Sequence, residues 1–172
     1  MPWFVKKTVY KKQNIFSKPG FWPTLTIKFV NLFIFATVNH WLIKSEPFKY
    51  SWSQFEKDQS TFWDGVRNYQ ARNNLREMKL GDLCLFYHSN EGKEVVGVAE
   101  VIKEHYPDPT ADDEQWLVVD VKPKMKLRNT VTLAQIKSDS RLSNIGLIRQ
   151  GRLSVIKLSK EEFNIILSLS EN

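Results

Sequence analysis

Apolar and polar residues alternate in an orderly way from Asn39 to the C-terminal end of the chain. Short apolar runs between turn residues are typical of strands, and a capping residue before a mixed apolar and polar segment is typical of a helix. Strands are predicted within residues 40–47, 82–90, 93–106, 115–123 and 151–159. Helices are predicted at 51–58, 132–137 and 159–170, and within 67–78 behind a loop.

Capping and turn residues mark the ends of these elements. The S/T-x-x-E/Q spacing, in which a hydroxyl accepts from the third helical N–H, occurs at Ser51/Gln54, Thr132/Gln135 and Ser159/Glu162. The sequence Asn90-Glu91-Gly92 predicts a hairpin between two strands. Because strands outnumber helices and short links join them, we predict an α+β domain. Its expected form is a small mixed or antiparallel β-barrel flanked by helices, rather than a parallel sheet.

The net charge of +6 is distributed unevenly along the chain. Six lysines and no acidic residue lie in residues 1–37, which leaves 19 basic and 19 acidic residues in 38–172. The net charge alone therefore does not indicate a nucleic-acid partner for the main domain. Any basic surface must come from local clustering, as at Arg67, Arg72 and Arg76.

Residues 1–37 are expected to be a basic leader, separate from a single domain at 38–172. We favour a true translation start at Val38, since a GTG start codon reads as valine inside a longer frame. A flexible extension and a secretory signal are the other interpretations. The apolar run at 29–38 favours a signal, but it is too short to cross a bilayer and no small-residue cleavage site follows it. No membrane partner is expected.

Catalytic and metal-binding patterns are few. Cys84 and His88 share one face of a predicted strand, but four residues at roughly 3.3 Å each separate them by about 13 Å, beyond hydrogen-bond reach. His40, His88 and His105 show no metal-ligand spacing, and the carboxylates within 108–114 are expected to be solvated. We therefore expect no enzyme, no metal and no cofactor. The single cysteine is expected in the core, and it favours a reducing compartment, the cytoplasm.

The remaining chemistry is that of binding. An aromatic ring that stacks on a nucleobase contributes about 1–3 kcal/mol, and amide, hydroxyl and backbone groups then read the edge of the base. Side chains of these types are Ser45, Trp63, Asn68, Tyr69, His88 and Ser89. The residues alone leave a second interpretation open, in which the rings pack in the core and the arginines only solvate a helix face.

Six motifs in a fixed order resemble the EVE domain family. They are HWLIKSEP (40–47), WDGVRNYQARNNLREMKLGD (63–82), LFYHSN (85–90), VVGVAEV (95–101), YPDPT (106–110) and RLSV (152–155). The resemblance runs from about Asn39 to Leu167, nearly everything except the leader. It implies a PUA-like fold related to YTH domains, and a non-catalytic module that binds nucleic acid carrying a modified base. Modified cytosine in DNA is the favoured ligand and modified RNA the alternative; a monomer is expected.

The resemblance also implies where the base would bind. Trp63 is similar to a cage aromatic of YTH domains, and Lys44-Ser45 to the strand end whose backbone faces the base. Gly65 would let the chain turn tightly beside Trp63. Residues expected to complete the pocket are Asn68, Tyr69, Tyr87, His88 and Ser89, and those expected to contact phosphate are Arg67, Arg72, Arg76 and Arg152.

Two other classes of function stay open. A hydrolase would be indicated by a metal or a strongly shifted carboxylate in the pocket. A structural or protein-interaction domain would be indicated if Trp63 and Tyr69 were fully buried with no cavity between them. A concave pocket between Trp63 and the end of the Lys44-Ser45 strand would favour base recognition.

Overall fold

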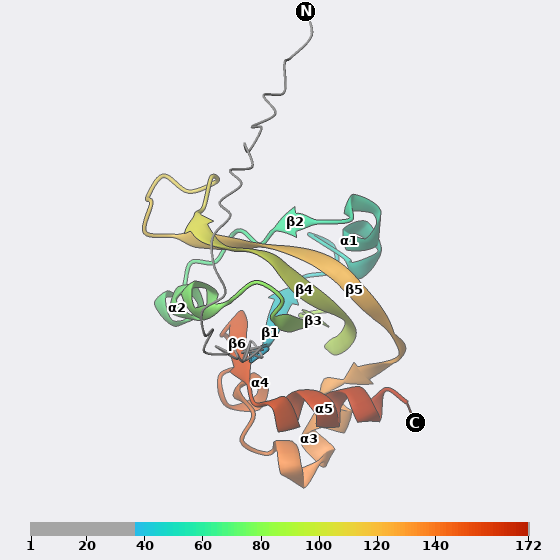
Figure 1. The fold of residues 1–172 in the computed structure, drawn as a ribbon. Helices are drawn as coiled ribbons and strands as arrows, with labels where there is room; N and C mark the ends of the chain where they lie inside the picture. Colours follow the sequence, from blue (N-terminus) through green and yellow to red (C-terminus); the bar gives the residue numbers. More distant parts are fainter. Residues whose placement is uncertain (1–36, 172) are drawn as a thin grey trace, which may run out of the picture. The chain divides into compact units, whose positions relative to one another are not determined.

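A computed structural model describes residues 37–171 of the chain (Figure 1). The strands are β1 (His40–Ser45), β2 (Thr61–Phe62), β3 (Leu83–His88), β4 (Glu94–Pro107), β5 (Leu117–Thr132) and β6 (Val155–Leu158). The helices are α1 (Trp52–Asp58), α2 (Tyr69–Glu77), α3 (Leu133–Ser138), α4 (Gly146–Arg149) and α5 (Lys160–Leu169), with a 3-10 turn at Ser140–Leu142. The predicted leader, except for Thr37, lies outside the described residues, so its interpretations stay predictions.

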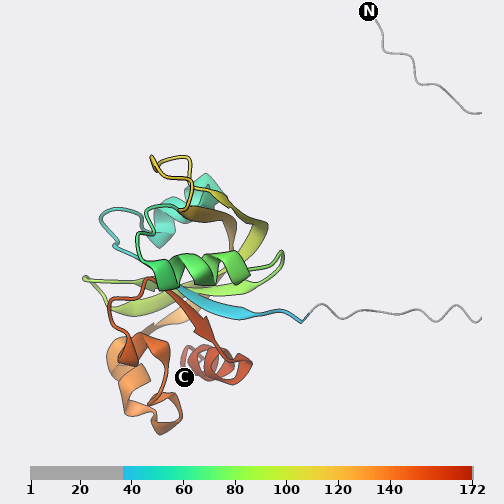
Figure 2. The same ribbon diagram turned by 90° about the vertical axis from the view of Figure 1, so that its left-hand side faces the viewer.

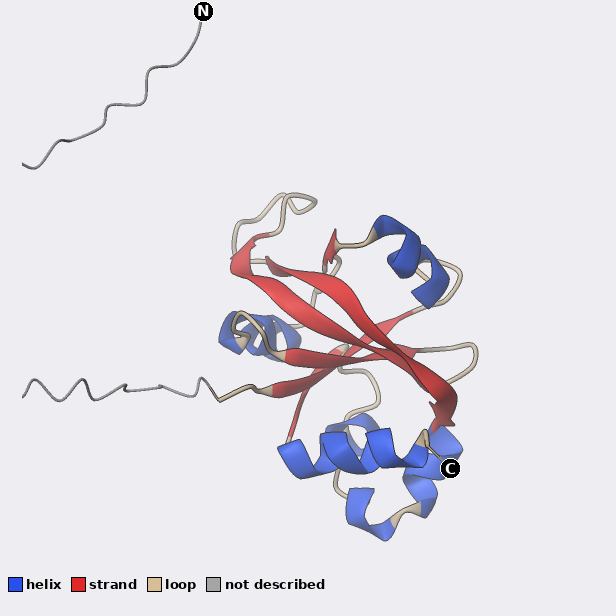
Figure 3. Cartoon of the chain, turned by 45° about the vertical axis from the view of Figure 1, so that its right-hand side comes forward, coloured by secondary structure: helices blue, strands red, loops and turns tan. Residues whose placement is uncertain are grey.

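The six strands of the described residues form one mixed sheet in the order β2-β5-β4-β3-β1-β6. β1 and β3 pair in parallel, and the other neighbours pair antiparallel. Figures 2 and 3 show α3, α4 and α5 together at one end of the sheet, apart from α1 and α2. The prediction of an α+β domain, with a mixed sheet flanked by helices, is confirmed.

The predicted capping residues begin helices α1, α3 and α5. Ser51 Oγ accepts from Gln54 N at 3.1 Å at the start of α1. The other two predicted pairs form complete capping boxes, in which each side chain bonds the backbone of the other residue. The predicted hairpin is also confirmed, since Asn90 and Gly92 have positive φ between β3 and β4.

Strand β5 is longer than the sequence predicts, because the prediction ended at Pro123. Proline cannot donate a ladder hydrogen bond and occurs in sheets at edges or bulges. Pro123 pairs with Ala99 of β4 at a shift in register, so the strand continues beyond it to Thr132. Four such shifts lie along the long β4-β5 pair, which bends across the domain (Figure 1).

A cluster of aromatic rings around Phe86 fills part of the core. Phe55 stacks on Phe86 with ring centroids 5.4 Å apart, and Trp52 and Trp63 contact it edge-on at 5.3 and 5.4 Å. Trp52 also lies so close to strand β4 that a Cβ atom at Gly97 would be 2.4 Å from its ring. Glycine at this position therefore allows α1 to pack directly on the sheet.

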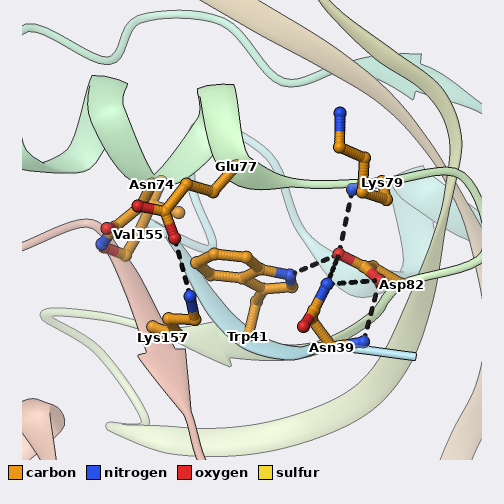
Figure 4. Close-up of polar contacts among 8 residues, drawn as sticks. All are labelled: Asn39, Trp41, Asn74, Glu77, Lys79, Asp82, Val155 and Lys157. Carbon is orange, nitrogen blue, oxygen red and sulfur yellow. Dashed lines mark hydrogen bonds and ion pairs between the residues drawn. The ribbon is translucent and has the colours of Figure 1, made fainter. Parts of the chain in front are cut away.

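The carboxylate of Asp82 is 1% exposed and connects two segments of the chain (Figure 4). It accepts from the backbone N–H and the side-chain amide of Asn39, from Trp41 Nε1 at 2.9 Å and from Lys79 N at 2.9 Å. These bonds join the start of β1 to the turn between α2 and β3. A buried charge is stabilised when it receives several hydrogen bonds, so this network holds α2 in register with the sheet.

Replacement of Asp82 by alanine is expected to lower the free energy of unfolding by about 2–5 kcal/mol, because buried N–H groups lose their acceptor. Denaturant unfolding measures the change. The matched control is Glu77→Ala, which removes the exposed Glu77–Lys157 ion pair in the same region (Figure 4). This control is expected to cost about 1 kcal/mol or less. Equal losses in the two variants would contradict the role of Asp82.

Candidate functional site

A pocket of about 670 Å³ lies between Trp63 and the end of β1. Its lining comes from residues 44–46, from 49–50, from 61–66 and from the two turns around residues 90 and 152. The cavity that distinguishes base recognition from a purely structural role is therefore present. Trp63 is buried at 6% exposure but Tyr69 is 60% exposed, so the burial of both rings expected of a structural domain is found only at Trp63.

Trp63 is both a wall of the pocket and part of the core. Its backbone N–H, directly after β2, donates to Val119 O of β5 at 2.8 Å. Gly65 has φ +71°, in the left-handed region that favours glycine, but residues 63–68 form no hydrogen-bonded turn or bend, so the predicted tight turn is not found there. The Trp63 ring is 6% exposed and contacts Phe86 edge-on. Its truncation would therefore remove a pocket wall and also about 3–5 kcal/mol of stability.

The end of β1 supplies a second part of the wall. Lys44 N donates to Ser154 O at 2.9 Å, and Lys44 Nζ donates to Gly151 O at 3.0 Å. Burial lowers the pKa of Lys44. Ser45 Oγ donates to a carbonyl of the following loop, and the carbonyl of Ser45 accepts from Ser89 N at 2.8 Å. These groups are held by bonds within the protein, so their main effect is to fix the shape of the wall.

Four polar side chains of the pocket have no hydrogen-bond or ionic partner within residues 37–171: Asp64, Asn90, Arg152 and Ser154. One carboxylate, one amide, one guanidinium and one hydroxyl are therefore available to a ligand. Phe62, which is 40% exposed, adds apolar surface beside Trp63. The sequence analysis missed Asp64, Asn90 and Phe62 as pocket residues. Their positions in the sequence could have indicated them, because Phe62 and Asp64 flank Trp63 and Asn90 follows Ser89.

The other four predicted pocket residues do not line this pocket. Asn68 is the N-cap of α2, where its Oδ1 accepts from the backbone N–H three residues later at 3.0 Å. Tyr69 begins α2 on the surface, and Tyr87 is 4% exposed. His88 Nε2 accepts from Trp52 N at 3.1 Å, which requires an unprotonated nitrogen. Burial lowers the pKa of His88 and favours that form.

Arg67 forms an ion pair with Asp108, which belongs to the acidic loop that was predicted to be solvated. Arg67 Nη1 donates to Asp108 Oδ2 at 2.8 Å, and the Asp108 side chain is fully buried. The expectation that all carboxylates of this loop are solvated is therefore wrong for Asp108. Burial by itself would raise the pKa of Asp108, but hydrogen bonds from Thr110 and Arg67 lower it overall. Arg67 is thus committed to a carboxylate.

The other predicted phosphate contacts lie on two surfaces. Arg152 lines the pocket. Arg72 and Arg76 extend from α2, outside the pocket, and both donate to Asn73 Oδ1. Of the predicted base and phosphate residues, the pocket brings together Lys44, Ser45, Trp63, Ser89 and Arg152.

Residues 37–171 contain neither a cluster of metal-ligand side chains nor a helix that could span a membrane. His, Cys, Asp and Glu side chains in this range form no group of three that could hold a metal ion. No helix in the same range is long and apolar enough to cross a membrane. Cys84 is fully buried, as predicted, and burial raises the pKa of its thiol. This cysteine is therefore a core residue rather than a reactive one.

The mixed sheet, the flanking helices and the pocket beside the ends of β1 and β2 define the class of the domain as PUA-like. An ASCH protein from Zymomonas mobilis, 15% identical with a TM-score of 0.50 over 76% of this chain and 95% of that chain, shares this fold. The EVE domain family model matches residues 39–169, so the chain belongs to the EVE domain family. The resemblance of the six sequence motifs to this family is confirmed.

Several relatives are similar over most of the domain. Thymocyte nuclear protein 1 of Homo sapiens is 37% identical over 167 residues, which cover 77% of this chain and 74% of that protein. The structure of human THYN1 protein in complex with 5-methylcytosine-containing DNA is 37% identical, with a TM-score of 0.73, and covers 78% of this chain and 98% of that one. A protein of Agrobacterium tumefaciens is 43% identical, with a TM-score of 0.75 over 77% and 93% of the two chains.

The N-cap role of Asn68 leads to a stability prediction. Asn68→Ala is expected to lower the free energy of unfolding by about 0.5–2 kcal/mol, because a helical N–H loses its acceptor. Asn68→Asp, which keeps the accepting oxygen, is the control and is expected to unfold at nearly the wild-type denaturant concentration. A wild-type stability of Asn68→Ala would contradict the capping role.

Proposed function

We propose that this chain is a non-catalytic nucleic-acid-binding module that holds one modified base in the pocket beside Trp63, with modified cytosine in DNA as the favoured ligand. The observation that carries the proposal is the pocket of about 670 Å³ between Trp63 and the end of β1. This volume lies in the range of small-molecule sites, about 300–1,000 Å³. An aromatic wall with a few free polar groups is suited to a flat ligand with a polar edge.

The free polar groups of the pocket match the chemistry of cytosine. Its exocyclic amine can donate a hydrogen bond to the carboxylate of Asp64. Its carbonyl oxygen can accept a hydrogen bond from Arg152 or Asn90. Because Trp63 is 6% exposed, only part of its ring can contact the base, and the contact would contribute less than a full stack, which is worth about 1–3 kcal/mol. A methyl group on the base adds apolar area to the contact, worth about 0.8 kcal/mol when fully buried.

Nucleic acid as the partner is supported by the relatives of this chain. Human THYN1 protein, 37% identical, is the relative whose structure is in complex with 5-methylcytosine-containing DNA. RNA with a modified base is the alternative ligand. A base inside a duplex must be flipped out at a cost of roughly a few kcal/mol, so an unpaired base is expected to bind more tightly. A monomeric state and a cytoplasmic location remain predictions that accompany the proposal.

A panel of short oligonucleotides tests the proposal. Single strands of DNA and RNA would carry cytosine, 5-methylcytosine or thymine (uracil in RNA) at one central position. Wild-type protein is expected to bind the 5-methylcytosine DNA about fourfold more tightly than the cytosine DNA, the ratio for one fully buried methyl group. Fluorescence anisotropy measures the dissociation constants. A preference found only in the RNA series would select the alternative ligand, and no preference in either series would contradict the proposal.

Asp64→Asn tests how the pocket chooses its base. Loss of the carboxylate is expected to reduce the preference for cytosine over thymine about tenfold, because an amide is a weaker acceptor for the cytosine amine. Glu161→Gln in α5 makes the same change in charge at an exposed residue outside the pocket and serves as the control. An unchanged preference in Asp64→Asn would exclude this carboxylate from base recognition.

Binding by the domain is expected to depend weakly on salt. Residues 38–172 carry 19 basic and 19 acidic side chains, so few phosphates can be contacted. Each phosphate contact contributes roughly 0.9 to the slope of log affinity against log salt on duplex DNA, so a slope of about −1 to −3 is expected. Titrations of residues 38–172 beside the full chain separate the contribution of the leader lysines. A steep slope without preference for a modified base would indicate delocalised electrostatic binding instead.

A further inference from the structure

Four side chains form an aromatic and arginine stack on the surface outside the pocket, the Tyr69 stack. The rings of Tyr69 and Trp116 stack with centroids 5.3 Å apart and planes 29° from parallel. The Arg72 guanidinium lies 5.0 Å from the Tyr69 ring centroid, and that of Arg67 lies 5.7 Å from the Trp116 ring centroid. Because Tyr69 is 60% exposed, a base can reach its ring by displacing the Arg72 guanidinium that lies over it.

The loop of residues 108–116 does not need the exposed Tyr69 ring to hold it closed. Residues 108–116 are already closed by the hydrogen bond from Asp108 N to Trp116 O at 2.8 Å and by the Arg67–Asp108 ion pair. The hydroxyl of Tyr69 has no hydrogen-bond partner within residues 37–171. Tyrosine, tryptophan and arginine are the residues enriched in the contacts that contribute most to binding. Their combination here indicates a binding surface.

The two sides of the Tyr69 stack carry opposite charges, positive along α2 and negative at the loop. Tyr69, Arg72 and Arg76 have the spacing of one face of helix α2. Neither arginine has a carboxylate partner in the part of the chain that the structure describes; both donate to Asn73 Oδ1. At the other side of the stack, the carboxylates of residues 112–113 line a shallow hollow beside the loop. A phosphate is therefore favoured along α2 and disfavoured at the loop.

The Tyr69 stack and the pocket are neighbours along the surface. Residues 61–66 contribute to the pocket, and the next residue, Arg67, belongs to the stack. A shallow hollow that includes Asn68 also shares Gly151 and Arg152 with the pocket. A nucleic-acid strand with one base in the pocket can therefore place an adjacent nucleotide at α2.

We infer that the Tyr69 stack is a second nucleic-acid site, which holds an unpaired base flanking the base in the pocket, with its phosphate at Arg72 and Arg76. The inference rests on the proposed function, because it assigns the neighbouring nucleotide of the same strand. Every base has a flat face, so stacking on Tyr69 adds affinity without a preference for sequence. The pocket selects the base, and the Tyr69 stack strengthens the hold on the strand.

The test uses the full chain and short single-stranded DNA with one central 5-methylcytosine. Tyr69→Ala is expected to weaken binding about 5- to 150-fold, the range for one lost stacking contact, whereas Tyr69→Phe keeps the ring and changes affinity less than about twofold. The free nucleoside 5-methyl-2′-deoxycytidine occupies only the pocket. Its affinity is therefore expected to be equal for wild type and Tyr69→Ala. Thermal melting of both variants monitors the fold.

An abasic nucleotide beside the 5-methylcytosine identifies the base that stacks. Two oligonucleotides carry the abasic position on one side or the other. Wild type is expected to bind one of these two oligonucleotides as weakly as Tyr69→Ala binds the intact strand. Tyr69→Ala is expected to bind that oligonucleotide with the same affinity as wild type does. Arg72→Gln is expected to reduce the salt slope by about 0.7, the value for one phosphate of a single strand.

The outcomes separate this inference from the proposed function. Equal binding of the intact strand by wild type and Tyr69→Ala overturns the second site, and the proposed function stands if 5-methylcytosine is still preferred. A loss in Tyr69→Ala without any preference for 5-methylcytosine supports the second site and contradicts the proposed function. A loss that accompanies a lower melting temperature, and that is the same on intact and abasic strands, shows a structural stack and overturns the inference.

Discussion

The hydrogen bonds to the buried carboxylate of Asp82 are the constraint on which the binding surface depends. Because β1 and β3 are parallel, the chain must return to the same end of the sheet between them, and residues 46–82 make that connection. The connection contains Trp63 and α2, which carry both proposed contacts. Asp82 closes it through bonds from Trp41 in β1 and Lys79 after α2. The pocket wall and the Tyr69 stack therefore keep fixed positions relative to one sheet.

Local signals in the sequence predicted most of the elements, whereas helix α4 and strand β2, which were missed, have no such signal. Capping residues specify α1, α3 and α5 because the side chain and the N–H that it bonds are three residues apart. Helix α4, in contrast, has no side-chain cap at Ile145. Strand β2 contains two residues and is defined by its pairing with the distant β5. The parallel pairing of β1 with β3 is a contact of the same non-local kind.

The candidate site was predicted in part for the same reason. The order of the motifs was enough to select Trp63 and Lys44-Ser45, which do line one pocket. Tyr69 was grouped with Trp63 because the two are close in sequence. Tyr69 instead begins helix α2, and the Tyr69 ring stacks on Trp116, which lies in the loop after β4. Asn90 was identified only as a turn residue. Its place at the pocket depends on where the β3-β4 hairpin lies next to β1, which no local pattern contains.

The balanced charge of the domain determines what kind of binding such a surface can provide. Non-specific affinity for nucleic acid comes mainly from phosphate contacts, and residues 38–172 have no excess of basic over acidic side chains to supply them. The proposed stacking on Trp63 and Tyr69, and the proposed edge contacts with Asp64, would depend on the base and respond little to salt. Selectivity is the ratio of specific to non-specific affinity, so weak phosphate binding raises it even when the total affinity is modest. A neutral domain with the proposed base pocket and the proposed adjacent stacking surface would therefore be suited to detect a single altered base among many ordinary ones.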